Sequence, residues 1–279
     1  ALLYTINAFA KGKRDFTVSD LMHGYRQMRG ETIRRVRSHR KIITGGAFDV
    51  LFQPIVDLGD RSVHHYEALM RLRKKGKAAS PFEFITFAED VGIINEFDLA
   101  MCRKVIGKIE SAAAMGDKLF VAVNLSGRSL GTDGFVDALF DLLKGSPHVG
   151  GRLIFEVTES FTITDLPAVN RVLAVLRTAG HAVCLDDFGA GATAYQYLRE
   201  LEVDFVKIDG AYVRDALTTP NGKAFLRSMT TLCKELKIDT IGEMVETEAE
   251  ATFLLEAGVD YGQGYLFGRP SAGLSAQPR

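Results

Sequence analysis

The chain has 279 residues, of which 47% are apolar and 25% charged, and its formal net charge at pH 7 is −1. This composition supports one large α/β domain, with or without an appendage, and excludes a disordered chain. No apolar stretch approaches the ~20 residues that a membrane-spanning helix needs, and residues 1–10 lack the basic start of a signal peptide. We therefore expect no direct insertion of this segment into a membrane.

Charge is distributed unevenly along the chain. Residues 1–45 carry ten Lys or Arg against three acids, whereas residues 46–279 carry 24 against 32. The basic run at residues 26–41 is compatible with a nucleic acid or a membrane surface, but no aromatic residues interleave with its later arginines, so a solvated connecting helix is favoured. We predict that residues 1–45 are the tail of an upstream regulatory domain plus a basic linker helix, which Gly45 and Gly46 end. Residues 46–279 form the main domain, and no nucleic-acid polymer is expected as a partner.

The cysteines give no sign of a metal site. Cys102, Cys184 and Cys233 lie far apart in the sequence and form no CxxC pair. This usage predicts a reduced, intracellular protein. Cys184 lies in an apolar run, so we interpret it as a small buried hydrophobic residue.

After residue 46, short β-rich runs alternate with amphipathic segments. The first two predicted strands, residues 50–56 and 63–69, are separated by too few residues for a parallel crossover, so we expect them to pair antiparallel. About eight strands alternating with helices predict an α/β fold, a TIM-like (β/α)8 barrel with an antiparallel first strand, preceded by the helical linker. The later strands are expected at residues 119–124, 153–157, 182–186, 205–208 and 240–243 and near Tyr261.

Two of the predicted helices have recognisable start signals. Ser80 with Glu83 forms a capping-box pattern, and Pro81 suits the first helical position. Thr247 with Glu250 repeats the capping-box pattern. The predicted helices are residues 81–88, 97–114, 135–143, 166–179, 195–201, 224–236 and 249–257.

Polar residues stand at the ends of most predicted strands. In a β/α barrel the carboxyl ends of the strands converge on one face, where the active site lies. Converging carboxylates would repel one another and raise each other's pKa values unless cations neutralised them. The donors are oxygens without His or Cys, a set that suits Mg²⁺ or Mn²⁺ better than zinc. These polar residues are Glu67, Asn124, Glu156, Asp186, Asp187, Lys207, Asp209, Glu243, Glu246 and Gln263.

The adjacent acids Asp186 and Asp187 indicate phosphodiester chemistry. Neighbouring side chains on a regular strand face opposite ways, so both reach the rim only if the backbone turns there, which the following glycines permit. One carboxylate could then bridge two ions, and two ions can polarise a phosphodiester and activate a water for in-line attack.

Lys207 lies in a largely apolar strand and has three interpretations. It could form a structural ion pair with Asp209, act as a cation near the attacking water or the phosphate, or serve as a Schiff-base amine. The surrounding acids should raise its pKa and so oppose the last role. His64 and His65 should point to opposite faces of their strand, so we interpret both as structural.

Eight short motifs in order resemble the signatures of EAL-domain cyclic-di-GMP phosphodiesterases. The resemblance spans residues 48–270; one tripeptide would carry no weight, but eight in order at strand ends make chance improbable. The motifs are Gln53-Pro54-Ile55-Val56, Glu67-Ala68-Leu69 with Arg71, Asn124-Leu125-Ser126, Glu156-Val157-Thr158-Glu159, Asp186-Asp187-Phe188-Gly189, Lys207-Ile208-Asp209, Val245-Glu246-Thr247 and Gln263-Gly264-Tyr265.

The resemblance implies a cytoplasmic bacterial enzyme that hydrolyses one phosphodiester bond of cyclic di-GMP to linear 5′-pGpG. It also implies two Mg²⁺ or Mn²⁺ ions, inhibition by Ca²⁺, and a homodimer. The implied catalytic residues are Lys207, which would hold the attacking water, Glu243, which would assist its deprotonation, and Glu67. The implied metal ligands are Glu67, Asn124, Glu156, Asp186 and Asp187, with Asp209 near the second ion. The implied substrate contacts are Gln53, Leu69, Arg71 and Gln263, and Glu159 and Glu246 would anchor the loop after Asp187.

The sequence departs from the family pattern in two places. The family usually has Ala-Glu-Gly-Val-Glu where this chain has residues 242–246, and we expect Met244 to crowd the site. The loop after the paired aspartates reads Ala192-Thr193-Ala194, which lacks the usual Ser-like residues and bears on loop stiffness and dimer contacts. Because every metal ligand is present, we expect an active enzyme. The alternatives are an inactive cyclic-di-GMP receptor that signals through the linker helix, and an unrelated Schiff-base aldolase that uses Lys207.

Overall fold

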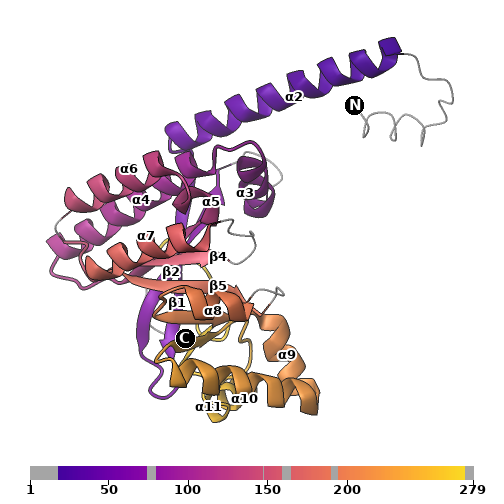
Figure 1. Cartoon of the computed structure of the whole chain (residues 1–279). Helices are drawn as coiled ribbons and strands as arrows, with labels where there is room; N and C mark the ends of the chain where they lie inside the picture. The colour runs from indigo at the N-terminus through magenta and orange to yellow at the C-terminus, as the bar shows by residue number, and fades with distance from the viewer. Residues whose placement is uncertain (1–17, 74–79, 147, 159–164, 190–193, 274–279) are drawn as a thin grey trace.

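The computed structural model describes residues 18–73, 80–146, 148–158, 165–189 and 194–273. Its longest helix, α2 (Val18–Thr44), projects away from the rest of the molecule (Figure 1). The helix ends where the sequence predicts, because Gly46 adopts a φ of 59°, a left-handed conformation that glycine reaches without strain.

The eight strands form a closed barrel in the order β1 to β8. β1 pairs antiparallel with both β2 and β8, and the other neighbours pair parallel. The predicted TIM-like barrel with an antiparallel first strand is therefore confirmed, and the carboxyl ends of β2 to β8 meet at one rim. The strands are β1 (Phe48–Asp57), β2 (Val63–Leu72), β3 (Val121–Leu125), β4 (Leu153–Thr158), β5 (Ala182–Phe188), β6 (Phe205–Ile208), β7 (Asp239–Gly242) and β8 (Tyr261–Gln263).

Helices surround this barrel and connect its strands (Figure 1). All seven predicted helices are present, with ends that differ by a few residues, but α5 and α9 were not predicted. Both are short and begin on glycine, so neither has the length or the start signal that sequence patterns need. The helices are α3 (Pro81–Asp90), α4 (Ile94–Ala114), α5 (Gly127–Leu130), α6 (Asp133–Lys144), α7 (Leu166–Thr178), α8 (Ala194–Glu200), α9 (Gly210–Thr218), α10 (Pro220–Glu235) and α11 (Glu248–Glu256).

The two predicted capping boxes have different outcomes. At the start of α11 the Thr247 side chain accepts from the Glu250 backbone N–H, and the Glu250 side chain accepts from the Thr247 backbone N–H. That capping box is therefore confirmed. At the start of α3 the Ser80 side chain makes no capping bond, so the predicted box is wrong there. The helix nevertheless begins at Pro81, whose fixed φ suits a first helical residue.

Apolar side chains pack in two places. One core lies between the strands and the surrounding helices, and a smaller one fills the inside of the barrel below the rim. Cys102 and Cys233 belong to the first core and Cys184 to the second, so all three cysteines are buried, as predicted for Cys184. Because apolar side chains fill the barrel interior, the polar side chains of the strands lie at the rim, and the site forms there.

The C-terminal half of α2 packs on the barrel and is not simply a solvated connector. Ile43 is buried in the outer core. The His39 ring stacks on Phe84 of α3 with 4.3 Å between centroids, and Arg40 forms a 2.8 Å ion pair with Glu96 of α4. The last turns of the predicted solvated connecting helix are therefore partly buried against the barrel. Their apolar and aromatic contacts, which lie far away in sequence, could not be read from the basic run.

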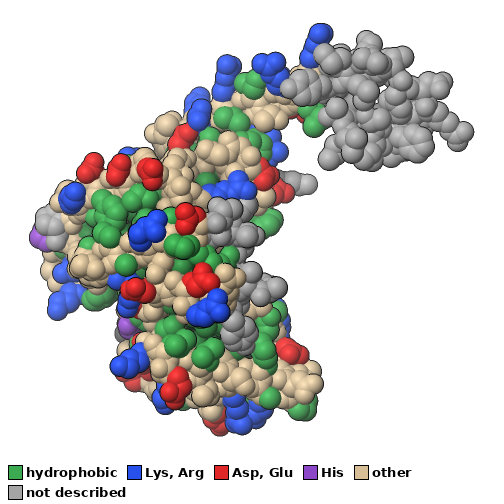
Figure 2. Space-filling view, viewed as in Figure 1, with side chains coloured by type: hydrophobic (Ala, Val, Ile, Leu, Met, Phe, Trp, Pro, Cys, Tyr) green, Lys and Arg blue, Asp and Glu red, His purple; other side chains and the backbone are tan. Residues whose placement is uncertain are grey.

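Basic side chains are visible along the projecting part of α2 (Figure 2). Within the part of the chain that the structure describes, no helix combines the length and the apolar character needed to span a bilayer. The assignment of residues 1–45 to an upstream domain and linker stays a prediction.

Candidate active site

A lysine at the centre of the barrel rim contacts four carboxylates. Nζ of Lys207, on β6, lies 2.9 Å from Glu243, 3.2 Å from Glu67, 3.3 Å from Asp186 and 3.4 Å from Glu156. The acids come from β2, β4, β5 and the residue after β7, so barrel closure brings them together. The suggested alternative of an ion pair with Asp209 is not what forms. The Lys207 ammonium therefore supplies part of the positive charge that the rim acids need.

Amide side chains complete the floor of the site. Glu67 accepts from Asn124 Nδ2 at 2.8 Å and from Gln263 Nε2 at 2.6 Å. Gln53 Oε1 lies 3.3 Å from the same Gln263 nitrogen, and Gln53 Nε2 donates to the Gly268 carbonyl. Side chains of β3 and β8 thus bond Glu67 directly, and Gln53 of β1 contacts Gln263. Hydrogen bonds from rigid strands give such a carboxylate a fixed orientation.

Burial and charge set the protonation of the group. Burial opposes the charge on Lys207, but its four carboxylates together hold the lysine pKa well above its usual value. Burial raises the pKa of Glu156 far above normal and that of Glu243 to about 7. Burial also acts on Glu67, but Lys207 and the amide hydrogen bonds outweigh it and lower its pKa. A raised lysine pKa favours the charged amine, which opposes the Schiff-base role.

The paired aspartates both reach the rim. Asp187 has a φ of 57°, so the backbone turns at this residue as the sequence analysis requires. The Asp187 backbone N–H also donates to Oδ1 of Asp186 at 3.0 Å. One oxygen each from Asp186, Asp187 and Glu243 lie within 4.8 Å of one another, a spacing that could hold a metal ion.

Unpartnered oxygens show that the site fits divalent cations. Asn124 Oδ1 and Glu156 Oε1 are buried and have no hydrogen-bond partner among the described residues. A buried acceptor without a partner is destabilising unless a cation or water satisfies it. Both oxygens belong to predicted ligands, beside the Asp186 and Asp187 carboxylates. Carboxylate and amide oxygens of this kind are ligands for Mg²⁺ or Mn²⁺.

Several predicted site residues lie at the edge of this arrangement or outside the described residues. Asp209 caps α9, with its Oδ1 accepting from the Ala211 backbone at 2.7 Å. Arg71 is exposed, two residues beyond Leu69 on β2. Glu246 lines the pocket described next, whereas Glu159 lies outside the described residues, as do Ala192 and Thr193. The roles of all these residues stay predictions.

A pocket of about 520 Å³ opens above the lysine and its acids. Gln53, Leu69 and Gln263, the predicted substrate contacts, line it, and their role stays a prediction. Gly264 and Tyr265 of the last motif line it too. Sequence reasoning missed Arg214 and Glu250 as lining residues, because nothing in the local pattern places them beside the rim.

Neighbouring helices hold the loops that carry the ligands. The Tyr212 hydroxyl on α9 donates to the Gly189 carbonyl, just after the paired aspartates. On the other side of the rim, Ser126 follows the ligand strand β3, and its hydroxyl donates to Glu89 at 2.9 Å. The Ser126 N–H donates to buried Asp98, also at 2.9 Å. Sequence reasoning missed these contacts, which join segments distant in the chain.

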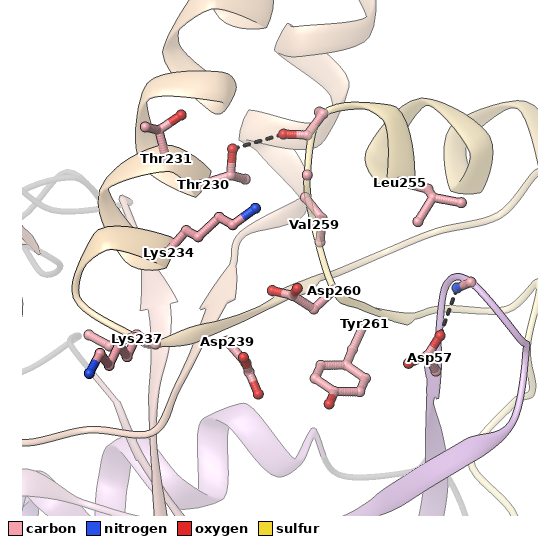
Figure 3. A pocket seen from close by; sticks show the side chains of 14 residues that line it. Asp57, Thr230, Thr231, Lys234, Lys237, Asp239, Leu255, Val259, Asp260 and Tyr261 are labelled. Carbon is pink, nitrogen blue, oxygen red and sulfur yellow. Dashed lines mark hydrogen bonds between the residues drawn. The ribbon is translucent and has the colours of Figure 1, made fainter.

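A larger hollow of about 680 Å³ lies at the opposite end of the barrel (Figure 3). Two of its polar side chains are held by hydrogen bonds: Thr230 donates to the Ala257 carbonyl at 2.8 Å, and Asp260 accepts from the Thr240 backbone and hydroxyl. None of the buried unpartnered side-chain atoms in the described residues belongs to a residue that lines it. The rim pocket, which combines such atoms with shifted pKa values, is therefore the candidate active site.

His64 and His65 lie away from this rim. His65 is buried and His64 is exposed, which fits opposite faces of β2. Their rings nevertheless meet, with 2.8 Å between the two Nδ1 atoms, because the His64 ring packs near Tyr261. The expectation that the two side chains point apart is therefore wrong at the rings. No change of role follows, since neither histidine contacts the rim acids.

The fold and the site together define a β/α-barrel protein with an acidic, cation-fitting site at the carboxyl ends of its strands. The chain belongs to the EAL domain family, whose model matches residues 36–270. It is 34% identical over 221 residues to cyclic di-GMP phosphodiesterase PdeB of Shewanella oneidensis, covering 78% of this chain and 26% of that protein. The chain thus spans about a quarter of that relative.

Solved structures resemble the barrel closely. The FimX EAL domain from Pseudomonas aeruginosa bound to c-di-GMP is 26% identical with a TM-score of 0.77, covering 89% of this chain and 99% of that one. The PaMucR phosphodiesterase in complex with c-di-GMP is 28% identical with a TM-score of 0.75, covering 85% and 97%. The fold and the family are shared with proteins that bind a cyclic dinucleotide.

Proposed function

We propose that this domain hydrolyses one phosphodiester bond of cyclic di-GMP to linear 5′-pGpG with two Mg²⁺ or Mn²⁺ ions. The observation that carries the proposal is the contact of Lys207 with four rim carboxylates beside two unpartnered ligand oxygens. Family membership and the cyclic-di-GMP phosphodiesterases among the relatives support the choice of substrate. A homodimer, a bacterial cytoplasm and an upstream regulatory domain are further parts of this proposal.

The ligand set would hold the cations at the rim. Bound divalent cations would polarise the phosphodiester and lower the pKa of a water. Ca²⁺ would inhibit, because the larger ion takes more ligands in a looser geometry. The proposed ligands are Glu67, Asn124, Glu156, Asp186 and Asp187, with Asp209 near the second ion.

The chain's own residues would position and deprotonate the attacking water. Lys207, held by four acids, would orient the water by donating a hydrogen bond. Glu243 would accept its proton, because its pKa of about 7 suits a general base at neutral pH. Gln53, Leu69 and Gln263 would hold the substrate in the pocket above, with Arg71 at its outer edge.

A cyclic-di-GMP receptor without hydrolysis is the second candidate. Met244 favours it, because this side chain stands in the pocket with a left-handed φ of 56° where the family usually has glycine. The complete ligand set favours the enzyme.

Chromatography of the purified chain with cyclic di-GMP and Mg²⁺ or Mn²⁺ tests the proposal, and pGpG is the expected product. Glu243→Gln should lower turnover at least ~100-fold, the scale of general-base assistance. Its affinity for cyclic di-GMP, measured by calorimetry in Ca²⁺, should change little. Tight binding by wild type without pGpG would establish the receptor. If wild type neither binds nor hydrolyses cyclic di-GMP, both candidate functions are rejected. A Glu243→Gln variant as fast as wild type would move the base role to Lys207 or to the cations.

A further inference from the structure

The pocket wall contains an arginine for which the rim chemistry gives no role. Arg214 lies on α9 and lines the pocket together with Glu243 and Tyr265. Among the described residues no carboxylate lies within ion-pair distance of its guanidinium. Its Nη1 instead lies 3.4 Å from the Met244 sulfur. A cation that faces a pocket without a protein counter-ion is available for an anionic ligand.

An unusual backbone conformation places the Met244 side chain beside Arg214. Its φ of 56° is strained for a residue with a side chain. Gly210, the first residue of α9, leaves the space that the side chain fills: a Cβ at Gly210 would lie 2.7 Å from Met244 Cβ and Sδ. Arg214 follows Gly210 by four residues, so it stands one turn along the same helix face. Arg214 and Met244 therefore form one wall of the pocket, and Gly210 lies against the Met244 side chain.

Charge decides what this wall can hold. The acids Glu246 and Glu250 also line the pocket, and Lys207 is buried on its floor among carboxylates. A cyclic dinucleotide has two phosphodiester groups, and only one can lie at the rim where hydrolysis is proposed. The other needs a cation away from the rim carboxylates, and among the described residues that line the pocket the basic side chains are Lys207, which its four acids hold, and Arg214. Arg214 is exposed and presents that charge.

We propose that Arg214, positioned by Met244 in the space left by Gly210, binds the non-reacting phosphodiester of the cyclic dinucleotide. This inference rests on the proposed function and extends it to a residue outside the rim. Met244 is then a positioning residue rather than an obstruction of the site. The bond is a charge-assisted hydrogen bond from a guanidinium to a phosphate oxygen.

Calorimetry in Ca²⁺ with cyclic di-GMP tests the proposal through Arg214→Gln. We expect affinity to fall about tenfold, the scale of a partly exposed charged hydrogen bond, while Ca²⁺ affinity measured without nucleotide stays unchanged. Added salt should weaken binding to wild type more than to the variant, because only wild type has the screened ion pair. Arg214→Lys should restore part of the loss. Arg227→Gln, an exposed arginine on α10, is the matched control.

Met244→Gly tests the positioning role. It should fold at least as stably as wild type, since glycine relieves the left-handed strain, yet bind cyclic di-GMP more weakly. The double variant with Arg214→Gln should lose no more affinity than Arg214→Gln alone, because both act through one contact. Unchanged affinity or an unchanged salt dependence in Arg214→Gln would overturn the inference while leaving the proposed function intact. Failure of wild type to bind cyclic di-GMP would overturn both.

Discussion

Nζ of Lys207 lies 2.9 Å from Oε1 of Glu243, at a distance where a charged lysine and the proposed general base share a hydrogen bond. The same amine contacts three further buried carboxylates. Without a cation these acids would repel one another in a region of low dielectric. The lysine thus holds the site together before any divalent ion arrives.

Lys207→Met should therefore destabilise the protein. Removing the central cation leaves three buried carboxylates and the half-buried Glu243 uncompensated. Breaking one buried pair costs about 3–5 kcal/mol. We expect thermal unfolding in EDTA to shift to markedly lower temperature, and Mg²⁺ to restore more stability to the variant than to wild type. Lys234→Met, an exposed lysine on α10, should have little effect. An unchanged midpoint in EDTA would contradict the stabilising role of Lys207.

Glu156→Gln should stabilise the metal-free protein and abolish hydrolysis. Burial and the neighbouring acids raise the pKa of Glu156, so its charged form is unfavourable without a metal. The neutral amide should raise the unfolding temperature in EDTA by a few degrees, on the scale of about 1–2 kcal/mol. Hydrolysis in Mg²⁺ should be lost, because a ligand oxygen is replaced by a weaker one. Asp137→Asn on the exposed face of α6 is the control, and full activity of Glu156→Gln would remove this residue from the ligand set.

The strand ends were predictable because strand residues alternate and the β/α barrel brings carboxyl ends together. Glu67, Asn124 and Asp186 could be placed at one rim on that basis alone. The central position of Lys207 could not be predicted in the same way. It lies 140 residues from Glu67 and 51 from Glu156, and only barrel closure defines the distances between their side chains.

Contacts between loops and helices could not be predicted from the sequence. The sequence predicts that Met244 crowds the site, whereas its side chain fills the space left by Gly210, 34 residues earlier in the chain. Asp98 and Ser126 belong to ordinary helix and loop patterns, and nothing in either pattern indicates that they bond. Side-chain packing across elements has no period, so it leaves no trace in hydrophobic patterning.

Tyr212→Phe should weaken catalysis without unfolding the barrel. The hydroxyl donates to the Gly189 carbonyl and so fixes the chain just after Asp187, while the ring stacks on Phe225 and is kept in the variant. We expect turnover of cyclic di-GMP to fall several-fold, about the effect of one hydrogen bond of ~1 kcal/mol. The unfolding temperature should change by only a few degrees. Turnover equal to wild type would show that the loop is held by other contacts.

The packing of α2 predicts where truncation becomes harmful. We propose that residues 1–45 connect the barrel to an upstream regulatory domain. A chain that begins at residue 35 keeps His39, Arg40 and Ile43 on the barrel and should remain folded, with hydrolysis near that of the full chain. A chain that begins at residue 45 exposes the apolar surface under Ile43 and Phe84 and should unfold at a lower temperature. Equal stability of the two truncations would show that the α2 contacts contribute nothing.

Asp98→Asn should change how stability depends on pH. Asp98 is buried on α4, where Oδ2 accepts from the Ser126 N–H at 2.9 Å and from the Ser129 hydroxyl at 2.6 Å. Burial raises the pKa of this carboxyl to about 7. An unfolded Asp has a pKa near ~3.9, so between about pH 4 and 7 the folded state binds more protons than the unfolded state. The free energy of unfolding therefore falls as the pH rises through this range, by up to roughly 4 kcal/mol from this one group.

Asparagine cannot ionise, yet its carbonyl oxygen can accept the same two hydrogen bonds. Urea unfolding at pH 5 and pH 8 should therefore show wild type losing stability relative to Asp98→Asn as the pH increases. Glu89, which also bonds Ser126, has its own pKa raised by burial and remains in both proteins, so the comparison between them isolates Asp98. Asp137→Asn provides the exposed control, for which the difference from wild type should not vary between the two pH values. If the difference between wild type and Asp98→Asn is likewise constant, Asp98 is ionised throughout this range. The Ser126 and Ser129 bonds would then be strong enough to stabilise a buried charge beside the ligand strand.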